Sequence, residues 1–491
     1  MTLLVLWALI WPLSANGTLA TWNTNLLVGF NSFYIIAVGL FAFFCFIIAL
    51  IPSIGRRTLG MPGQKPEFSN FSWFSMMFGA GLGVGLMTFA TAEPLGLWGS
   101  NPMVVAGEVE GNTQEALKSA YRYTFAHYGF HAWAIYVLTG LSLAYFAYTR
   151  DMPLTIRSAL TPLLGSVANG PIGHLVDVLG VVATILGVSV TIGFGVSQLV
   201  DGVYAITGAQ WSKVGLIVAL VMIMAMSIVS AVSGVGRGVK YLSNLNLVLS
   251  LILLLTFVIF GSFLFAMTTY ATALFDYIVH FFSLSFNAYS RRQFAWQAAW
   301  TTFYWAWWIA FAPFVGLFLA RISKGRSIRE FVLGAVIAPS LVCFAWMTIL
   351  GATAIDLELT GGANGSIIGA SNTAKLFVTL QNMLSGGLLQ AITIMCVVLI
   401  MTFLVTSADS GILVMNTIMS GGAEETGIKH RIIWGILLTL VIGTLLLAGG
   451  GGMDALKNAM IIAALPFTFI MVLMMISLAK ALYRDSKREN S

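Results

Sequence analysis

Six of the nine residues from Phe303 to Phe311 are aromatic, and none of the nine is charged. Tyr304, Trp308 and Phe311 are spaced four and three residues apart, so their rings share one face of a helix. Such rings suit a bulky cation, for example a quaternary ammonium, because each ring face attracts positive charge by about 0.5–2 kcal/mol. An aromatic packing ridge or an interfacial tryptophan belt is the alternative interpretation. The rest of the chain favours the cation site.

Glycine occupies alternate positions in the sequence GAGLGVGL at 79–86. Gly81 and Gly85 have the spacing of a helix-packing motif, but the four glycines together would be distributed round a helix instead of forming one stripe. The pattern therefore favours an unwound segment, which persists at membrane depth where it lines a cavity. We expect the N–H groups near Gly81 and Gly83 to bind a carboxylate and the free carbonyls to bind Na⁺.

A second polar group interrupts an apolar stretch, where residues 403–410 read FLVTSADS. A lone hydroxyl in a membrane helix usually bonds its own backbone. Thr406, Ser407, Asp409 and Ser410 together place several oxygens at membrane depth. Oxygen ligands that face an unwound segment suit Na⁺. For Asp409 three roles are open: a proton carrier, a gate partner or a structural charge.

These segments belong to a chain that is too apolar for a soluble protein. Of its 491 residues 58% are apolar and 9% are charged, and its mean hydropathy is +0.92, whereas a soluble domain carries about 25% charged residues. We therefore predict an all-α polytopic membrane protein with about twelve transmembrane helices. The apolar runs lie near residues 2–20, 26–52, 72–97, 115–149, 174–206, 211–232, 241–280, 297–320, 328–354, 386–416, 431–450 and 456–480.

The first run is the least regular, because Pro12 and Asn16 interrupt it. A signal peptide would also be apolar, but no basic residues precede this run, which favours a first span. The three cysteines all lie in apolar runs and are expected to pack in the core, without disulfides or a metal site. They are Cys45, Cys343 and Cys396.

Basic residues alternate between successive loops. With about twelve spans both termini lie on one side, and the loops and tail of that side hold 17 of the 24 Lys and Arg residues. The positive-inside rule makes this side cytoplasmic, so the net charge of +6 reflects topology and does not indicate nucleic-acid binding. Arg291 and Arg292 are exceptions, in a stretch at 285–296 that is expected to form an amphipathic helix along the outer surface.

Pro313 and Gly316 follow the aromatic segment and predict a second interrupted helix. Interrupted spans at matching places in two halves are typical of inverted-repeat transporters, whose sites lie at the midplane. The predicted organisation follows from this spacing. It consists of two N-terminal transmembrane helices at 1–60, a first five-helix repeat at 61–284, the amphipathic helix at 285–296, and a second five-helix repeat with a short cytoplasmic tail at 297–491.

Other chemistries are less well supported. The sequence contains no G-x-S-x-G or H-E-x-x-H motif and no helix with paired carboxylates, which argues against an enzyme. His127 and His131 share one helical face, but no third metal ligand is evident nearby, so hydrogen-bonded histidines are favoured. Glu93 precedes Pro94 and is expected to anchor a helix end. A channel would need an open pore, whereas interrupted helices favour alternating access.

Taken in order, these segments resemble the betaine/choline/carnitine transporter family. The matching segments are Phe303–Glu330 (FYWAWWIAFAPFVGLFLARISKGRSIRE), GAGLGVGLM at 79–87 with Ala92-Glu93-Pro94, HAWAIY at 131–136 and TSADSG at 406–411. The first is highly specific, and the resemblance covers essentially the whole chain. It implies the five-plus-five inverted repeat after two extra helices, a homotrimer in the inner membrane, and osmoprotective uptake of trimethylammonium or related onium compounds by secondary active transport.

The resemblance also implies roles for individual residues. The family's aromatic box falls on Tyr128, Trp133, Tyr136, Trp307 and Trp308, with Phe311 beside it and Trp305 on the substrate pathway. Tyr128 takes a place often held by tryptophan, and Phe311 one held by tryptophan or tyrosine. The box is then smaller, which makes dimethylsulfoniopropionate an alternative to glycine betaine.

The family's main sodium site is formed by backbone carbonyls and two hydroxyls. It falls on Gly79, Leu82, Phe403, Thr406 and Ser407. A second sodium site maps to Thr184 and Phe314, but Val188 stands in place of its other threonine, so that site is incomplete. Sodium-independent exchangers of the family carry methionine at the position of Val315, which favours sodium coupling here. The leading hypothesis is Na⁺-coupled symport of a betaine-like zwitterion; the alternative is sodium-independent exchange of carnitine- or choline-like compounds.

Overall fold

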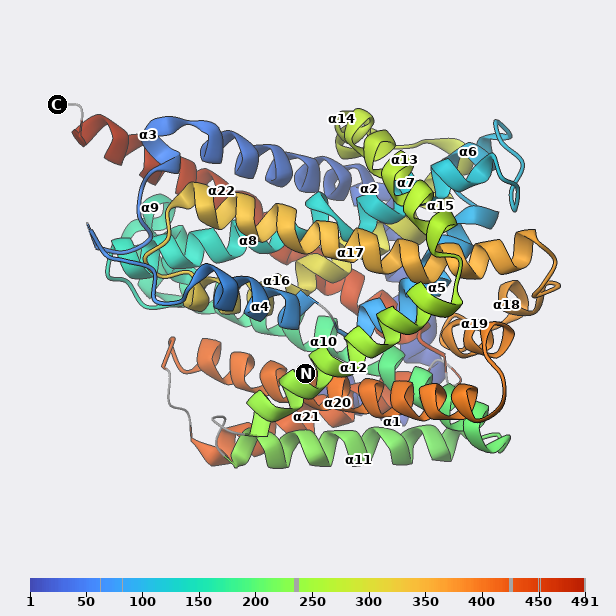
Figure 1. The fold of residues 1–491 in the computed structure, drawn as a ribbon. Helices are drawn as coiled ribbons and strands as arrows, with labels where there is room; N and C mark the ends of the chain where they lie inside the picture. Colours follow the sequence, from blue (N-terminus) through green and yellow to red (C-terminus); the bar gives the residue numbers. More distant parts are fainter. Residues whose placement is uncertain are drawn as a thin grey trace.

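The computed structural model describes residues 1–61, 63–81, 83–233, 238–423, 427–448, 450 and 452–489. Within these ranges the chain is helical and forms no β-strand, and ten helical segments are long and apolar enough to cross a membrane. The long helices run side by side through the molecule (Figure 1). The predicted class, an all-α polytopic membrane protein, is confirmed.

The chain order of the elements shows where the predicted spans begin and end. The α-helices are α1 (Thr2–Ile10), α2 (Pro12–Leu50), α3 (Pro52–Gly55), α4 (Asn70–Gly81), α5 (Val84–Gly99), α6 (Pro102–Ala106), α7 (Ala116–Tyr128), α8 (Phe130–Ala144), α9 (Thr161–Leu164), α10 (Pro171–Thr207), α11 (Lys213–Val232), α12 (Gly238–Phe260), α13 (Phe263–Val279), α14 (Phe281–Phe286), α15 (Arg291–Gln297), α16 (Phe303–Ile322), α17 (Ile328–Leu359), α18 (Ser366–Gly369), α19 (Lys375–Met383), α20 (Gly386–Met419), α21 (Ile428–Ala448) and α22 (Asp454–Glu489). Short π-helical or 3-10 segments are η1 (Tyr145–Thr149), η2 (Arg157–Leu160), η3 (Gly165–Asn169) and η4 (Ala298–Thr302).

The N-terminal helices are divided at a different residue from the one predicted. α1 has 9 residues and α2 has 39, and Trp11 separates them. Pro12 is the cause, since it disfavours helical torsions at Trp11 and begins a new helix at its first position. Asn16 does not interrupt α2. A helix of 9 residues is about 14 Å long and the hydrocarbon core about 30 Å thick, so the separate span expected near 2–20 does not form.

The single span expected at 241–280 is two helices, because α12 ends at Phe260 and α13 begins at Phe263. Arg122 of α7 donates hydrogen bonds of 2.5 and 3.1 Å to the two carboxylate oxygens of Asp276, which fasten α13 to α7. Burial raises the pKa of the Asp276 carboxyl, but the hydrogen bond and charge of Arg122 outweigh burial and hold that pKa below its usual range.

The amphipathic helix expected at 285–296 is not a single helix. α14 ends at Phe286, and α15 begins at Arg291. The side chain of Gln297 stabilises the loop between them, since it accepts a hydrogen bond from the Tyr289 N–H at 3.0 Å and donates one to the Asn287 carbonyl at 2.9 Å. These bonds replace the ones that a continuous helix would make.

The break predicted in the glycine-rich span is confirmed. α4 ends at Gly81, α5 begins at Val84, and Gly83 between them has an extended backbone (φ −142°, ψ −170°). Leu82 lies outside the described residues. The helix expected at 72–97 is therefore two half-helices, and neither is one of the ten long segments.

A further break, which the sequence did not predict, separates α7 from α8 at Gly129 (φ −98°, ψ −137°). A Cβ at this position would lie 2.2 Å from Cζ of Phe344, so only glycine allows α17 to approach here. The aromatic residues predicted on one helix at 115–149 are consequently divided between two.

The interruption predicted at Pro313 and Gly316 is wrong. α16 continues through both residues, and its irregular turn is the π-helical η4 that precedes it. Membrane helices tolerate proline where neighbouring groups adjust to it. Gly316 instead packs against α8, where an added Cβ would lie 2.7 Å from Cγ2 of Thr139 and 3.0 Å from the backbone N of Gly140. The division into two five-helix repeats stays a prediction.

The valine substitution Gly316→Val should weaken the packing of α16 against α8, because the new side chain would overlap backbone atoms that cannot rotate away. We expect a loss of about 1–3 kcal/mol in stability, measured as a lower midpoint of thermal unfolding in detergent. Gly29→Val in α2 is the matched control, since nothing lies within 4 Å of its added Cβ. Equal midpoints for the two variants would contradict the role of Gly316 in packing.

Candidate functional site

Five aromatic side chains gather where α7, α8 and α16 meet. This aromatic cluster consists of Tyr128, Trp133, Tyr136, Trp307 and Trp308. Trp308 is stacked on Trp307, with 4.8 Å between ring centroids, and meets the edges of Tyr128 at 5.4 Å and Tyr136 at 6.3 Å. Trp133 joins the cluster through Tyr136, at 5.7 Å. The structure thus brings together all five residues expected to form a box.

The break at Gly129 explains the orientation of the tryptophans. A helix that ends leaves the carbonyls of its last turn without helical donors. The indole N–H of Trp308 donates to the His127 carbonyl at 2.7 Å, and that of Trp305 donates to the Ala126 carbonyl at 3.1 Å. The end of α7 therefore holds two indole rings of α16 in position.

Two of the predicted site residues lie apart from these rings. Trp305 is fully buried and stacks on His131, with 5.0 Å between ring centroids. It lines a small cavity together with Tyr123 and Tyr289. Phe311 packs its ring against Phe314 at 5.0 Å. Among the described residues, neither ring makes a ring contact with the aromatic cluster.

Three further aromatic residues, of which the sequence had singled out only Tyr304, complete the surroundings. Tyr304 lies 5.3 Å from Tyr128 and 6.2 Å from Trp308 between ring centroids. Phe89 of α5 and Phe194 of α10 contact Trp307 at 6.0 and 5.7 Å. The spacing of Tyr304 from Trp308 indicated its contact, whereas nothing in the sequence identifies the two phenylalanines, which come from other helices.

The glycine-rich break lies directly beside the aromatic cluster. A Cβ added to Gly85 would be 3.6 Å from Cη2 of Trp307 and 3.9 Å from Cη2 of Trp308, whereas one added to Gly83 would have no atom within 4 Å. α5 begins at Val84, so the N–H groups of its first turn have no acceptors within the helix. Backbone donors and a positive helix end therefore adjoin the ring faces. Gly79 and Gly81 belong to the last turn of α4.

A buried acid–histidine pair lies behind the cluster. Glu93 of α5 and His127 of α7 are fully buried, with 2.5 Å between Oε1 and Nδ1. The other ring nitrogen of His127 is 2.9 Å from the hydroxyl oxygen of Thr301 in η4. The ring of His127 stacks on Tyr304 at 5.0 Å. Glu93 does not cap a helix end as expected but joins three elements around the site.

His131 is also hydrogen-bonded through both ring nitrogens, to the hydroxyls of Tyr277 at 3.1 Å and Ser285 at 2.8 Å. The prediction that both histidines are satisfied by hydrogen bonds is confirmed. The turn at Gly129 lies between them, so they point to different partners despite their spacing of four residues.

The predicted sodium ligands of α20 lie near the break. The start of α5 and the middle of α20 both lie against Gly195 of α10. A Cβ added to Gly195 would be 2.5 Å from Val84, the first residue of α5, and 2.5 Å from Leu404, which follows Phe403 in α20. The hydroxyl of Thr406 donates to the carbonyls of Thr402 at 3.0 Å and Phe403 at 3.1 Å. The same oxygen accepts a hydrogen bond from the side-chain amide of Asn246 in α12 at 3.4 Å. Ser407 is half-buried, and the third carbonyl position, Leu82, is outside the described residues.

The second sodium site receives less support. The Thr184 hydroxyl donates a hydrogen bond to the Gly180 carbonyl at 2.8 Å. Val188 packs against α20, since a Cβ added to Gly411 would lie 3.2 Å from Cγ1 of Val188. No hydrogen bond or ring contact among the described residues joins Thr184 to Phe314. A valine therefore packs at the position where the resemblance implies a ligand hydroxyl.

Asp409 connects two helices. Its carboxylate accepts a hydrogen bond from the Ser230 hydroxyl of α11 at 2.5 Å, and it is fully buried. Arg431 of α21 donates to the carbonyl of Ala231, next to Ser230, at 2.8 Å. This arrangement supports the structural role among the three considered for Asp409.

Comparisons with known proteins agree over nearly the whole chain. The model of the BCCT (betaine/carnitine/choline) family of transporters matches residues 1–487. The glycine betaine transporter OpuD of Bacillus subtilis is 38% identical over 488 residues, which are 98% of this chain and 92% of the relative. A glycine betaine transporter of Acinetobacter baylyi is 40% identical over 96% of this chain and 69% of its own. The osmo-independent choline transporter BetT1 of that species is 37% identical over 89% of this chain and 82% of its own.

The substitution Glu93→Ala should destabilise the protein by about 3–5 kcal/mol, because it removes the partner of a fully buried histidine. Glu93→Gln should cost less, since its amide oxygen still accepts a hydrogen bond from His127. Thermal unfolding in detergent measures both variants. Glu110→Ala is the control, since this glutamate is exposed. If Glu93→Ala were no less stable than Glu110→Ala, the pair would have no structural role.

Proposed function

Because the chain belongs to the betaine/carnitine/choline transporter family, we propose that it carries a betaine-like onium zwitterion into the cell by Na⁺-coupled symport. Family membership makes it a multi-pass membrane transporter and excludes an enzyme. Relatives named as glycine betaine transporters support glycine betaine as the substrate. Dimethylsulfoniopropionate is the alternative, since its sulfonium presents a similar cation to the rings.

One observation supports a zwitterion in particular, namely that the first turn of α5 lies beside Trp307 and Trp308, within 4 Å of a Cβ added to Gly85. The ring faces attract an onium group, and the first-turn N–H groups of α5 would bind a carboxylate. The two opposite charges of a betaine lie only a few bonds apart, which suits adjacent sites of opposite preference. In this proposal the aromatic cluster binds the cation, and the segment around Gly81 and Gly83 binds the carboxylate.

Sodium coupling is proposed from the ligand chemistry near the break. Thr406 and Ser407 offer hydroxyl oxygens and Phe403 offers a carbonyl, all within α20, and Leu404 of this helix lies close to Val84 at the start of α5. Gly79 offers a carbonyl in the last turn of α4. Hard oxygen ligands of this kind suit Na⁺. The Thr406 hydroxyl donates its hydrogen to backbone carbonyls, which leaves oxygen lone pairs for Na⁺. Sodium would compete there with the side-chain amide of Asn246 in α12, which donates to this oxygen at 3.4 Å.

A sodium-independent exchanger for carnitine- or choline-like compounds is the second candidate. The relative named as a choline transporter supports choline as a substrate in that case. The proposal also includes a homotrimer in the inner membrane, termini on the cytoplasmic side, and a role in osmoprotection. The excess of basic residues in alternate loops supports the orientation.

Replacing the central ring tests the cation site. Trp308→Leu should weaken binding of glycine betaine by about 1–2 kcal/mol, which is about ten-fold or more in Kd. Trp308→Phe should lose less, because it keeps a ring face but not the hydrogen bond to His127. Calorimetric titration of the purified protein measures Kd, and Trp211→Leu, between α10 and α11, is the control. An unchanged Kd in Trp308→Leu would remove this ring from the site.

Removing the two hydroxyls tests sodium coupling. The double variant Thr406→Ala with Ser407→Ala should raise the Na⁺ concentration for half-maximal uptake in proteoliposomes, because two ligand oxygens are lost. Thr393→Ala is the matched control on the same helix, since its hydroxyl bonds only the Leu389 carbonyl in the structure. Replacing chloride should have no effect. Full uptake with K⁺ in place of Na⁺ on both sides would exclude the symporter and favour the exchanger.

A further inference from the structure

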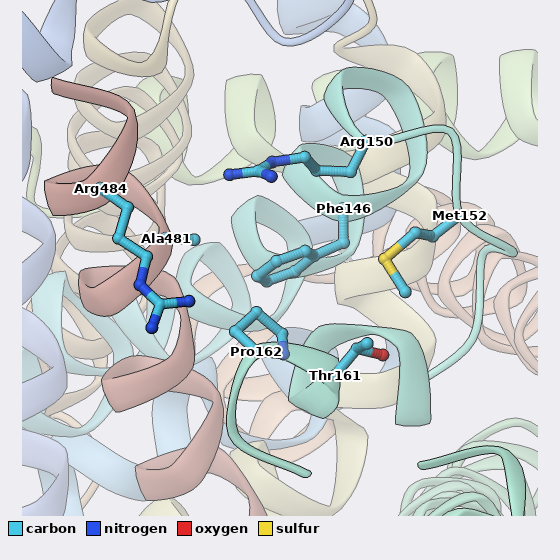
Figure 2. Close-up of a pocket in the computed structure, with 7 residues that line it drawn as sticks. All are labelled: Phe146, Arg150, Met152, Thr161, Pro162, Ala481 and Arg484. Atoms are coloured by element: carbon cyan, nitrogen blue, oxygen red, sulfur yellow. The ribbon is translucent and has the colours of Figure 1, made fainter. Parts of the chain in front are cut away.

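A cavity of about 300 Å³ lies beside the last turns of α22, and no residue of the aromatic cluster lines it (Figure 2). Three segments form it: η1 with the residues directly after it, the start of α9, and the last turns of α22. The residues that line it are Phe146, Arg150, Met152, Thr161, Pro162, Ala481 and Arg484. It is separate from the site proposed for the substrate and has no assigned role.

Two arginines reach this cavity from opposite walls, Arg150 from the turn after η1 and Arg484 from α22 (Figure 2). Arg150 is partly neutralised, since it pairs with Asp485 at 2.6 Å. Arg484 is exposed and has no hydrogen-bond or ion-pair partner among the residues that the structure describes. Lys480, one turn before it, donates to the Pro162 carbonyl at 2.8 Å. The cavity therefore keeps an excess of positive charge.

Apart from Thr161, the remaining lining residues are apolar. Phe146, Met152 and Pro162 cover one side, and Ala481 leaves room on the face of α22. The cavity lies where α8 and α22 end, which is the depth of lipid head groups for helices that cross a membrane. A ligand with an anionic head and a short aliphatic part would satisfy both kinds of wall.

We propose that this cavity binds a phosphate group, supplied either by the head group of an anionic phospholipid or by a soluble phosphate. A guanidinium group can donate two parallel hydrogen bonds to two phosphate oxygens, and it therefore binds phosphate with a more defined geometry than an ammonium group does. A phosphate between Arg150 and Arg484 would join the 150–162 segment to the end of α22. The bound ligand would stabilise this end of the protein.

The test uses the full chain in a neutral detergent and follows the midpoint of thermal unfolding during two titrations. One titration uses inorganic phosphate against chloride at matched ionic strength, and the other uses phosphatidylglycerol. Arg484→Gln removes the unpaired guanidinium. Lys487→Gln is the matched control, since it removes the same charge from the same helix but lies over the ring of Tyr483, outside the cavity lining.

At least one ligand should raise the midpoint in the unsubstituted protein and in Lys487→Gln. Its half-saturating concentration should be ten-fold or more higher in Arg484→Gln. A response to phosphatidylglycerol alone identifies a lipid head group, and a response to both ligands shows that the phosphate suffices. The proposal fails if neither ligand raises the midpoint, or if the two variants lose the response equally, since the effect would then depend on surface charge alone.

Discussion

The structure depends on one constraint, that a helix ending inside an apolar bundle must find partners for its free backbone groups. α7 ends at Tyr128, and two of the carbonyls left free there accept hydrogen bonds from Trp305 and Trp308. Because these bonds fix both indoles, the break at Gly129 determines where the ring faces of α16 point. The aromatic cluster is in this sense a consequence of a backbone interruption on a neighbouring helix.

The second interruption has the opposite polarity. α5 starts beside the rings with N–H groups that lack helical acceptors, and the backbone at Gly83 faces open space. One helix end is thus satisfied by protein donors, while the other presents donors next to the cluster. Ring faces that attract a cation and N–H groups that attract an anion therefore lie side by side. Neither the glycine-rich segment nor the aromatic segment contains a basic side chain. That arrangement suits a ligand that carries both charges.

Buried polar groups tie these elements together. Glu93, His127 and Thr301 link α5, α7 and η4, and Asn31 of α2 reaches Gln297 at 3.0 Å. Each bond that failed to form here would leave a buried polar atom unsatisfied, at a cost of about 1–3 kcal/mol. The surroundings of the rings are consequently specified by directional bonds as well as by packing. The π-helical turn η4 lies within this network, and its irregular backbone brings Thr301 toward His127.

The sequence by itself determined the class of the protein, most of its membrane helices and the break near Gly83, because these follow from composition, periodicity and local backbone preference. Tyr128, Trp133 and Tyr136 were assigned to the aromatic cluster only through the resemblance to a known family. Only the tertiary structure decided what each proline and glycine does. Pro12 ends a helix while Pro313 is accommodated in one, and Gly316 accepts a neighbouring helix while Gly83 leaves space open. Nor could spacing along α16 separate Trp308 from Trp305, since their partners come from α7 and α8. Local sequence sets which conformations are allowed, but the neighbour that a residue meets comes from elsewhere in the chain.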